Sequence, residues 1–484
     1  MRFGIAGQVL GVVWIGLAGV LVVPSLFAVF AAEPWLPFAR TALIALASGA
    51  LMLLAFRRPD DAGLSHREAI LTVTLVWFSV CAIGAIPFAT HPGLQMGIVD
   101  ASFESVSGFT TTGATVLSGL DALPHSVLLW RSITQWIGGM GMVIFGVAIL
   151  PLLGVGGMGL YKAEAPGPTK DKMTPRIAET AKLLWVIYLG LSLLAGGLFY
   201  LQGMTAFDAV NHAMTGIATG GFSTHDLSLG YYDSASIRLV ATGAMLVAGT
   251  SFAVLHRALT GELSWSEQPE LRAYVGILCL ATAVLTLNLW IQMPEQFPSL
   301  LSALGDAAFQ AVSILTGTGY ASADFDSWPP ISHAVLFVLF FSGGMAGSTS
   351  GGVKVLRVML LWRVAMLQFF KLAHRRGVAV VRLGAHTLDD RILLSSLGFI
   401  VMWLALLAVG TLALAAGGAD PLTSLSAAAV SLANIGPGFG EVGPSRTFAT
   451  LGSGSKLVLE ALMILGRLEI YTVLVVLTPR FWRY

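Results

Sequence analysis

Three stretches of the chain follow one pattern: DASFESVSGFTTTGAT from Asp100, DAVNHAMTGIATGGFS from Asp208, and DAAFQAVSILTGTGYA from Asp306. Each begins with Asp-Ala and carries a glycine thirteen residues after the aspartate. The aspartate and the glycine shift together, by 108 residues and then by 98. A weaker fourth copy, TSLSAAAVSLANIGPG, begins at Thr423. Four related units indicate an object with pseudo-four-fold symmetry.

The composition of the chain places it in a membrane. Its 484 residues are 56% hydrophobic and only 11% charged, whereas a soluble domain has about 25% charged residues. The net charge of +1 gives no indication of a nucleic-acid partner. Cys81 and Cys279 lie within apolar runs, and we interpret them as small buried hydrophobic residues. No small-residue cleavage site follows the first apolar run, which we therefore expect to be a retained helix.

Long apolar runs alternate with the repeated segments. A membrane helix needs ~20 apolar residues, and two leading runs, 3–31 and 41–56, come before the first segment. The runs expected to flank the four segments are 69–89 and 125–153, 178–201 and 237–255, 271–291 and 333–361, and 392–416 and 456–478. The expected divisions are 1–66 for the leading helices and 67–177, 178–268, 269–390 and 391–484 for the repeats. The predicted fold is an all-α integral membrane protein, with two leading helices and four helix–pore loop–helix repeats around one pore.

The loops between these runs differ in charge. One set holds most of the Lys and Arg residues, including those of 162–182 and 371–391, whereas the opposite set is acidic. Because short cytoplasmic loops carry an excess of Lys and Arg, both termini are expected in the cytoplasm. All four repeated segments then enter the membrane from outside. The acidic outer loops would raise the local concentration of cations.

The repeated segments have the features of a cation filter. Non-helical backbone at membrane depth is tolerated only inside protein or beside a water-filled path. A helix of about 10–12 residues would point its negative C-terminal end inward, and glycine would let the following carbonyls turn toward a potassium ion. The candidate lining is Thr111, Thr112 and Gly113; Thr219, Gly220 and Gly221; Gly317, Thr318 and Gly319; and Asn434, Ile435 and Gly436. The alternative is that these are ordinary turns between helices.

The register of the fourth segment stays open on residues alone. Counting from the hydroxyl residue that precedes each turn places the fourth position at Pro437. Matching the aromatic residue that follows Gly221 and Gly319 selects Gly438 instead.

With these segments, the chain resembles the TrkH/KtrB/HKT superfamily of potassium transporters over essentially its whole length. The two leading helices are typical of TrkH-type subunits and absent from KtrB-type subunits. The resemblance implies four fused channel-like units with one retained glycine each, in a bacterial inner membrane. The family's fourth filter resembles Asn434-Ile435-Gly436, which favours Gly436. Gly113, where some sodium-favouring HKT proteins carry serine, implies potassium.

A glycine-rich stretch, FSGGMAGSTSGGVKV at 341–355, interrupts the third repeat. Glycine costs ~1 kcal/mol relative to alanine inside a helix, so we expect the span to break here. The resemblance implies that 343–352 is an intramembrane loop that gates the pore. The expected gate residues are Gly343, Gly344, Gly347, Ser348, Gly351, Gly352, Lys354 and Arg467. The alternative is close glycine-mediated helix packing. A phosphate loop is excluded, because Val355 follows the lysine where Ser or Thr is required.

Arg467 lies near the middle of the last apolar run, and an intramembrane charge is a functional hypothesis by default. The resemblance implies that it points into the pore below the filter, where it repels cations or holds the glycine loop by its carbonyls. The alternative is an ion pair with Glu460 that only neutralises the helix. His212 and Gln310 hold the position that Glu104 has in the first segment and are expected to brace the pore helices. His225-Asp226 lacks a third ligand nearby, so no metal site is predicted there.

Potassium uptake is the leading functional hypothesis, with sodium or mixed cation transport as the alternative. A coupled transporter for an organic solute would have inverted halves, whereas these repeats run parallel. An enzyme would need clustered His, Cys or carboxylates at membrane depth, which the spans barely supply. No cofactor is expected, and K⁺ would be the transported ion. The resemblance implies a homodimer on a cytosolic TrkA ring that binds nucleotides, docked on the basic loops; channel and ion-coupled symport both stay open.

Overall fold

The structure, a computed structural model, describes residues 3–56, 65–148, 173–374, 382–383, 386–388 and 390–483. These residues are mainly helical, and the β-structure among them is one antiparallel pair, β1 (Arg382–Leu383) with β2 (His386–Thr387). Three parts of the predictions lie outside the described ranges. They are residues 57–64, which follow the second leading run, the last residues of the span at 125–153, and most of the two basic loops, 162–172 and 375–381.

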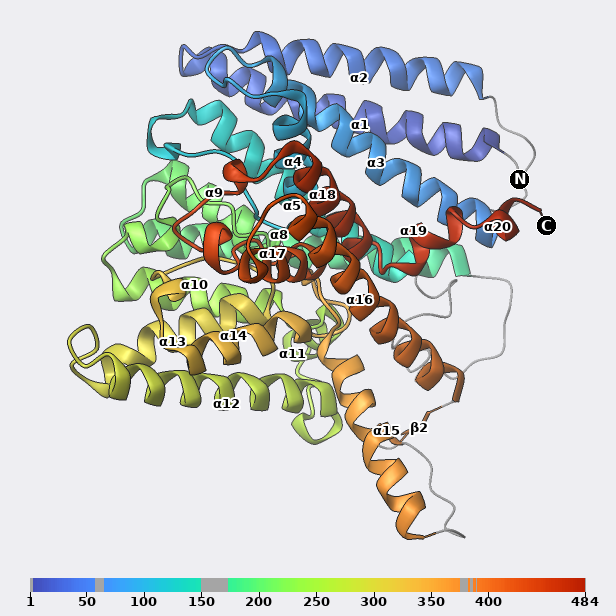
Figure 1. Cartoon of the computed structure of the whole chain (residues 1–484). Helices are drawn as coiled ribbons and strands as arrows, with labels where there is room; N and C mark the ends of the chain where they lie inside the picture. Colours follow the sequence, from blue (N-terminus) through green and yellow to red (C-terminus); the bar gives the residue numbers. More distant parts are fainter. Residues whose placement is uncertain are drawn as a thin grey trace.

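The two leading helices form a pair at the edge of the molecule (Figure 1). They are α1 (Phe3–Phe30) and α2 (Leu36–Ala55). The pair packs closely because Gly11 and Gly49 face each other, and a Cβ on either would lie within 3.0 Å of the other's carbonyl oxygen. Trp14 donates from its indole nitrogen to Ser79 Oγ at 2.9 Å, which ties the pair to the first repeat.

Four sets of helices follow, and each contains a long helix, a short helix and a second, inner helix. The first is α3 (His66–Thr90), α4 (Ile98–Phe109), η1 (Leu120–Ala122) and α5 (His125–Ala148). The second is α8 (Met173–Leu201), α9 (Ala206–Ile217), η2 (Ser228–Tyr231), α10 (Ala235–Ala248) and α11 (Phe252–Leu259). The third is η3 (Trp265–Glu267), α12 (Pro269–Gln292), α13 (Leu300–Leu315), η4 (Phe325–Ser327), α14 (Pro330–Ser342) and α15 (Val355–Ala373). The fourth is α16 (Asp390–Ala416), α17 (Pro421–Ala433), η5 (Gly440–Val442), η6 (Phe448–Thr450), α18 (Ser453–Arg467), α19 (Tyr471–Val476) and α20 (Pro479–Arg483).

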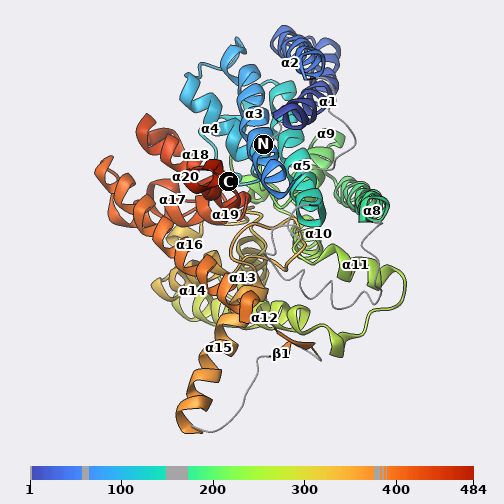
Figure 2. The ribbon, with the colours of Figure 1, turned by 90° about the vertical axis from the view of Figure 1, so that its right-hand side faces the viewer.

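The four repeats close into a ring. Each short helix packs between the two helices of its own repeat and also touches the inner helix of the preceding repeat. These cross-repeat pairs are α9 with α5, α13 with α10, α17 with α14, and α4 with α18. The last pair joins the fourth repeat to the first, and Figure 2 shows the four repeats in order around a common centre. The predicted fold of two leading helices and four pseudo-symmetric repeats is confirmed.

The inner helices differ from the prediction in two repeats. The runs 237–255 and 456–478 were expected to be continuous helices, and this is wrong. The helix pair α10–α11 bends by 105°, and α18 ends at Arg467 before α19 begins. At the first break, Gly249 O accepts from Met345 N at 2.9 Å and Phe252 N donates to Gly347 O at 3.1 Å. The third repeat therefore takes up backbone groups that a continuous helix would pair internally.

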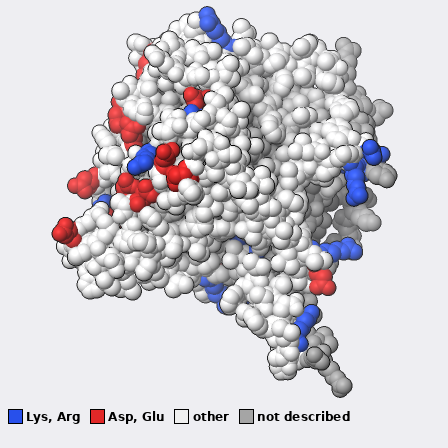
Figure 3. Space-filling model, in the orientation of Figure 1, with Lys and Arg blue, Asp and Glu red and all other residues white. Residues whose placement is uncertain are grey.

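Length and composition allow six helices within the described ranges to cross a membrane, or seven if the bent α10–α11 pair counts as one span. The loops at the two ends of the molecule carry opposite charges. In Figure 3 acidic side chains gather at one end, opposite the end where both termini lie in Figure 1, and most Lys and Arg side chains lie toward the terminal end. This arrangement agrees with the charge asymmetry that the sequence shows between its two sets of loops.

Candidate functional site

Each short helix ends in a turn whose backbone alternates in handedness. In the first turn, Thr111 (φ 52°) and Gly113 (φ 81°) have positive φ. The matching pairs are Thr219 and Gly221, Gly317 and Gly319, and Asn434 and Gly436. Positive φ is uncommon for a residue with a Cβ. A backbone in which φ alternates in sign turns successive carbonyls toward one side, as rings of coordinating carbonyls require.

The fourth turn shares this backbone only at Asn434, Ile435 and Gly436. Ile435 N donates to Val430 O at 2.9 Å, just as Thr112 N donates to Ser107 O at 2.9 Å. Val430 therefore corresponds to Ser107, and Ser431 lies one residue later. Counting from Ser431 misplaces the fourth turn at Pro437 for this reason.

The glycine at the third position of each turn packs against the next turn. A Cβ on any of the four would lie within 3.0 Å of a carbonyl oxygen of the neighbouring second position. The pairs are Gly113 with Gly220, Gly221 with Thr318, Gly319 with Ile435, and Gly436 with Thr112. The order runs once around the four repeats and closes on the first. A side chain at any of these positions would push a carbonyl of the ring.

Hydrogen bonds behind the ring hold the turns together. Thr112 Oγ1 lies 2.7 Å from Thr110 Oγ1 and accepts from Asn434 Nδ2 at 2.9 Å. Asn434 Nδ2 also donates to Met463 O at 2.9 Å. Asn434 thus joins the fourth turn to the first across 322 residues of sequence, and sequence spacing alone could not have revealed this role.

A buried ion pair braces the outer end of the first turn. Arg131 Nε donates to Glu104 Oε1 at 2.7 Å, and both side chains are at most 1% exposed. Glu104 also accepts from Val116 N at 3.1 Å, while Arg131 Nη1 donates to Ser223 O at 2.9 Å, just beyond the second turn. The Glu104–Arg131 pair therefore joins the first repeat to the second. The sequence pattern alone does not reveal this role of Arg131.

The two residues that match Glu104 behave differently from it. His212 Nε2 lies 2.9 Å from Ser223 Oγ, so it links its pore helix to the chain beyond the second turn. The Gln310 side chain is fully buried, and its amide has no hydrogen-bond partner among the described residues.

The glycine-rich loop lies against the ends of the pore helices. It joins α14 to α15 and contains the expected gate residues from Gly343 to Lys354. Thr349 Oγ1 reaches Ile217 O at 3.2 Å and Ala248 O at 3.1 Å, and Gly351 packs against Ala433 and Asn434. Close packing of a continuous helix therefore does not explain these glycines, because they lie outside the helices.

The loop is held in a folded shape by its own groups. Gly344 N donates to Ser350 Oγ at 2.8 Å, and Val355 N donates to Gly344 O at 3.1 Å. The buried Lys354 ammonium donates to Ser350 O. Glu270, at the start of α12, accepts from Ala346 N at 2.6 Å.

Arg467 contacts the loop from the fourth repeat. Its Nη1 donates to Thr349 O at 2.8 Å and its Nη2 donates to Gly138 O at 3.0 Å. The guanidinium is 1% exposed and so links the fourth, third and first repeats below the ring. An ion pair with Glu460 does not account for this charge, because Glu460 accepts from Ser102 Oγ at 2.8 Å instead.

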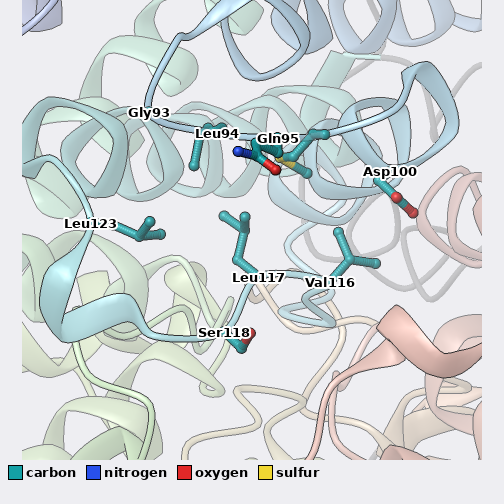
Figure 4. Close-up of a pocket in the computed structure, with 9 residues that line it drawn as sticks. Gly93, Leu94, Gln95, Asp100, Val116, Leu117, Ser118 and Leu123 are labelled. Carbon is teal, nitrogen blue, oxygen red and sulfur yellow. The ribbon is translucent and has the colours of Figure 1, made fainter.

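A small cavity and an ion pair lie at the acidic end of the molecule, near the first turn. A cavity of about 220 Å³ is lined by Gly93, Leu94, Gln95, Met96, Asp100, Val116, Leu117, Ser118 and Leu123. Figure 4 shows the lining side chains around it. At its edge, Lys456 Nζ donates to Asp100 Oδ1 at 2.6 Å.

His225 lies in the loop after the second turn, between Asp121 and Asp208. Burial alone would lower the pKa of His225, but its interactions with Asp208 and Asp121 raise that pKa above its ordinary value. Within the described ranges, no three His, Cys, Asp or Glu side chains form a group that could hold a metal ion.

Comparisons with known proteins cover most or all of the chain. Residues 37–484 match the family model TrkH, described as a cation transport protein. The Trk system potassium uptake protein TrkH of Salmonella typhimurium is 40% identical over 488 residues, which cover 100% of both chains. The protein of the same name from Vibrio parahaemolyticus is 42% identical over 453 residues, 92% of each chain. The crystal structure of the potassium transporter TrkH from Vibrio parahaemolyticus superposes with a TM-score of 0.92 at 38% identity, covering 100% of both chains.

Proposed function

The chain belongs to the TrkH family, and on this premise we propose that this multi-pass membrane protein takes up potassium through a carbonyl-lined filter. The observation that carries the proposal is the closed circle of four turns, in which each third-position glycine packs on a carbonyl of the next turn. The lining residues are the four triplets that begin at Thr111, Thr219, Gly317 and Asn434.

The geometry of the ring suits a dehydrated monovalent cation. Rings of carbonyl oxygens can replace the hydration shell of a potassium ion, and the four turns would supply them. The pore helices α4, α9, α13 and α17 all end at the turns, and the C-terminal end of a helix carries roughly −0.5 of an elementary charge. These protein groups would replace the favourable electrostatic interactions that a cation loses when it sheds its hydrating water.

Rubidium flux into liposomes that contain only the purified protein tests this function. Gradients of potassium, sodium and protons are imposed separately. We expect rubidium to enter down its own gradient, and potassium to compete far better than sodium. Equal competition by sodium would support mixed cation transport instead, and dependence on an imposed proton or sodium gradient would identify symport.

We further propose that residues 343–352 obstruct the pore below the filter and that Arg467 holds them closed. The loop contacts the ends of α9 and α10 through Thr349 and the end of α17 through Gly351. Arg467 donates to the loop at Thr349 O. A buried positive charge below a cation filter opposes permeation unless it moves or is neutralised.

Control of the gate is assigned to a partner. We propose a homodimer in a bacterial inner membrane, with both termini in the cytoplasm and a cytosolic TrkA-like nucleotide-binding ring beneath it. The basic loops at 162–182 and 371–391 would help to dock the ring. The purified protein should show no response of flux to ATP or NADH, and addition of the ring should confer one. A response without the ring would contradict this division, and normal ring binding by a charge-reversed Lys170, Lys172 and Arg176 variant would remove the docking role alone.

A further inference from the structure

The four filter turns differ at their second position in one respect. Three of them carry a side chain there, Thr112, Thr318 and Ile435, whereas the second turn has Gly220. The backbone does not demand glycine at this position, because Gly220 is absent from the glycines with positive φ. The second turn also has Ala218 where the first and third have Thr110 and Thr316.

In the first and third turns, the side chains at these two positions form a hydrogen bond behind the ring. Thr110 Oγ1 lies 2.7 Å from Thr112 Oγ1, and Thr316 Oγ1 lies 2.8 Å from Thr318 Oγ1. Ala218 and Gly220 cannot form this pair.

Gln135, from the inner helix α5 of the first repeat, occupies the place of these side chains. Its Nε2 donates to Gly220 O at 2.6 Å and its Oε1 accepts from Phe222 N at 3.0 Å. The side chain is fully buried. A Cβ on Gly220 would lie within 3.0 Å of three Gln135 side-chain atoms, so the glycine is needed to admit the glutamine.

We propose that Gln135 is a positioning residue of the filter, which supplies from the neighbouring repeat the side chain that the second turn lacks. It holds the peptide groups on both sides of Gly221, and it fixes the Gly220 carbonyl against which Gly113 packs. The inference rests on the proposed filter function and adds to it a determinant of ion preference outside the four triplets.

Four variants test this role by relative sodium and rubidium flux in liposomes. Gln135→Ala and Gln135→Met remove the amide. We expect relative sodium permeability to rise about tenfold in each, because a buried carbonyl loses its partner. Methionine is chosen because Met463 holds the corresponding position in the fourth repeat. Met463 precedes Gly466 by three residues, as Gln135 precedes Gly138, and both glycines pack on a pore-helix carbonyl.

Gly220→Thr alone should impair selectivity to a similar extent, because its side chain meets Gln135. The double variant Gln135→Ala with Gly220→Thr provides the side chain within the turn itself and makes room for it. We expect it to return selectivity to within about threefold of the wild type, since the second turn then carries at its second position the threonine of the first and third turns. A merely structural role for Gln135 would not produce this rescue.

Two controls separate the possible failures. Gln8→Ala removes a similar bond, from Gln8 Nε2 to Phe56 O at 2.7 Å, far from the ring, and should leave selectivity unchanged. Gly113→Ser tests the filter itself. If Gly113→Ser alters selectivity while both Gln135 variants keep it, the inference fails and the filter stands; if none of the three alters it, the filter assignment fails. A double variant less selective than both single variants would also overturn the inference.

Discussion

The four repeats are alike in the ring of turns and differ from one another in the layer directly beneath it. All four turns have the same alternating backbone and the same glycine contact with a neighbour. Below them, α5 runs unbroken from His125 to Ala148, α10 bends into α11, a loop separates α14 from α15, and α18 ends at Arg467. We therefore expect ion preference to depend on features that four repeats share, and opening to depend on features that a single repeat has.

The largest effect is expected from disturbing the shared layer. Gly113→Ser, Gly221→Ser and Gly319→Ser each add a Cβ that collides with a ring carbonyl at a residue with positive φ. The strain of about 1–3 kcal/mol should raise relative sodium permeability roughly 10- to 100-fold. Competition of sodium with rubidium uptake measures this change.

Gly119→Ser is the matched control for these variants, because Gly119 also has positive φ (70°) but faces open space. It should retain wild-type selectivity. Wild-type selectivity in all three filter variants would show that the filter assignment is wrong.

A smaller effect is expected from changes in the layer beneath the turns, where the four repeats differ. These changes should alter the rate of ion flux and not the ion preference. Arg467→Ala removes the bonds to Thr349 O and Gly138 O together with the buried charge. Hydrogen bonds to charged groups contribute about 1.5–3 kcal/mol each, so flux should rise by at least about tenfold. Arg446→Ala, at an exposed arginine, serves as control. Unchanged or lower flux in well-folded Arg467→Ala protein would refute the gate.

A milder change of the same loop should give a milder increase. Thr349→Val keeps the shape of the side chain and removes its bonds to Ile217 O and Ala248 O. The loss of about 1 kcal/mol predicts a rise in flux of roughly three- to fivefold without a change of preference. Thr242→Val, which removes a bond to Arg238 O within one helix, should have no such effect. A change in selectivity would place Thr349 with the filter and not the gate.

The smallest effect concerns the outer loops and pH. Because the folded protein raises the pKa of His225 through Asp208 and Asp121, protonated His225 stabilises the fold. This contribution is fully present below the ordinary histidine pKa of about 6.5 and is lost as pH rises through the raised value. His225→Gln should lower stability at pH 6 by about 0.5 kcal/mol and change it little at pH 9.

Thermal unfolding in detergent at the two pH values measures the difference. His66→Gln, at an exposed histidine, is the control. An equal loss of stability at both pH values would contradict the electrostatic origin of the effect.

The sequence was most informative where the chain repeats itself. The Asp–Gly spacing located three of the four turns, and the charge of the loops predicted that all four lie at one end of the molecule. Residue counting failed at the fourth turn because its first residue of positive φ, Asn434, follows Ser431 by three residues, whereas Thr111 follows Ser107 by four, and only the backbone geometry reveals this. Resemblance to a family, and not counting, supplied Gly436.

The breaks in the inner helices were predictable only where glycine is dense. The glycine-rich stretch after Phe341 predicts a break in the helix by its composition alone. The break after Ala248 depends on Met345 and Gly347, and the end of α18 depends on positive φ at Glu469 and Ile470. Tertiary contacts of this kind override local preference. The same limit concealed Gln135, whose partners lie 85 and 87 residues away.

The bond from Asn434 to Thr112 has a consequence for biogenesis. The first turn meets its last neighbour only after 322 further residues have been made, which takes roughly 16 to 64 seconds at ~5–20 residues per second. During that time the Thr112 hydroxyl and the open edge of the first repeat have no fourth repeat to close on them. A nascent chain released before Asn434 therefore lacks the contact that closes the ring between its fourth and first turns. Such products should be unstable in the membrane and open to its proteases, so that the cell is protected from partial, unselective pores.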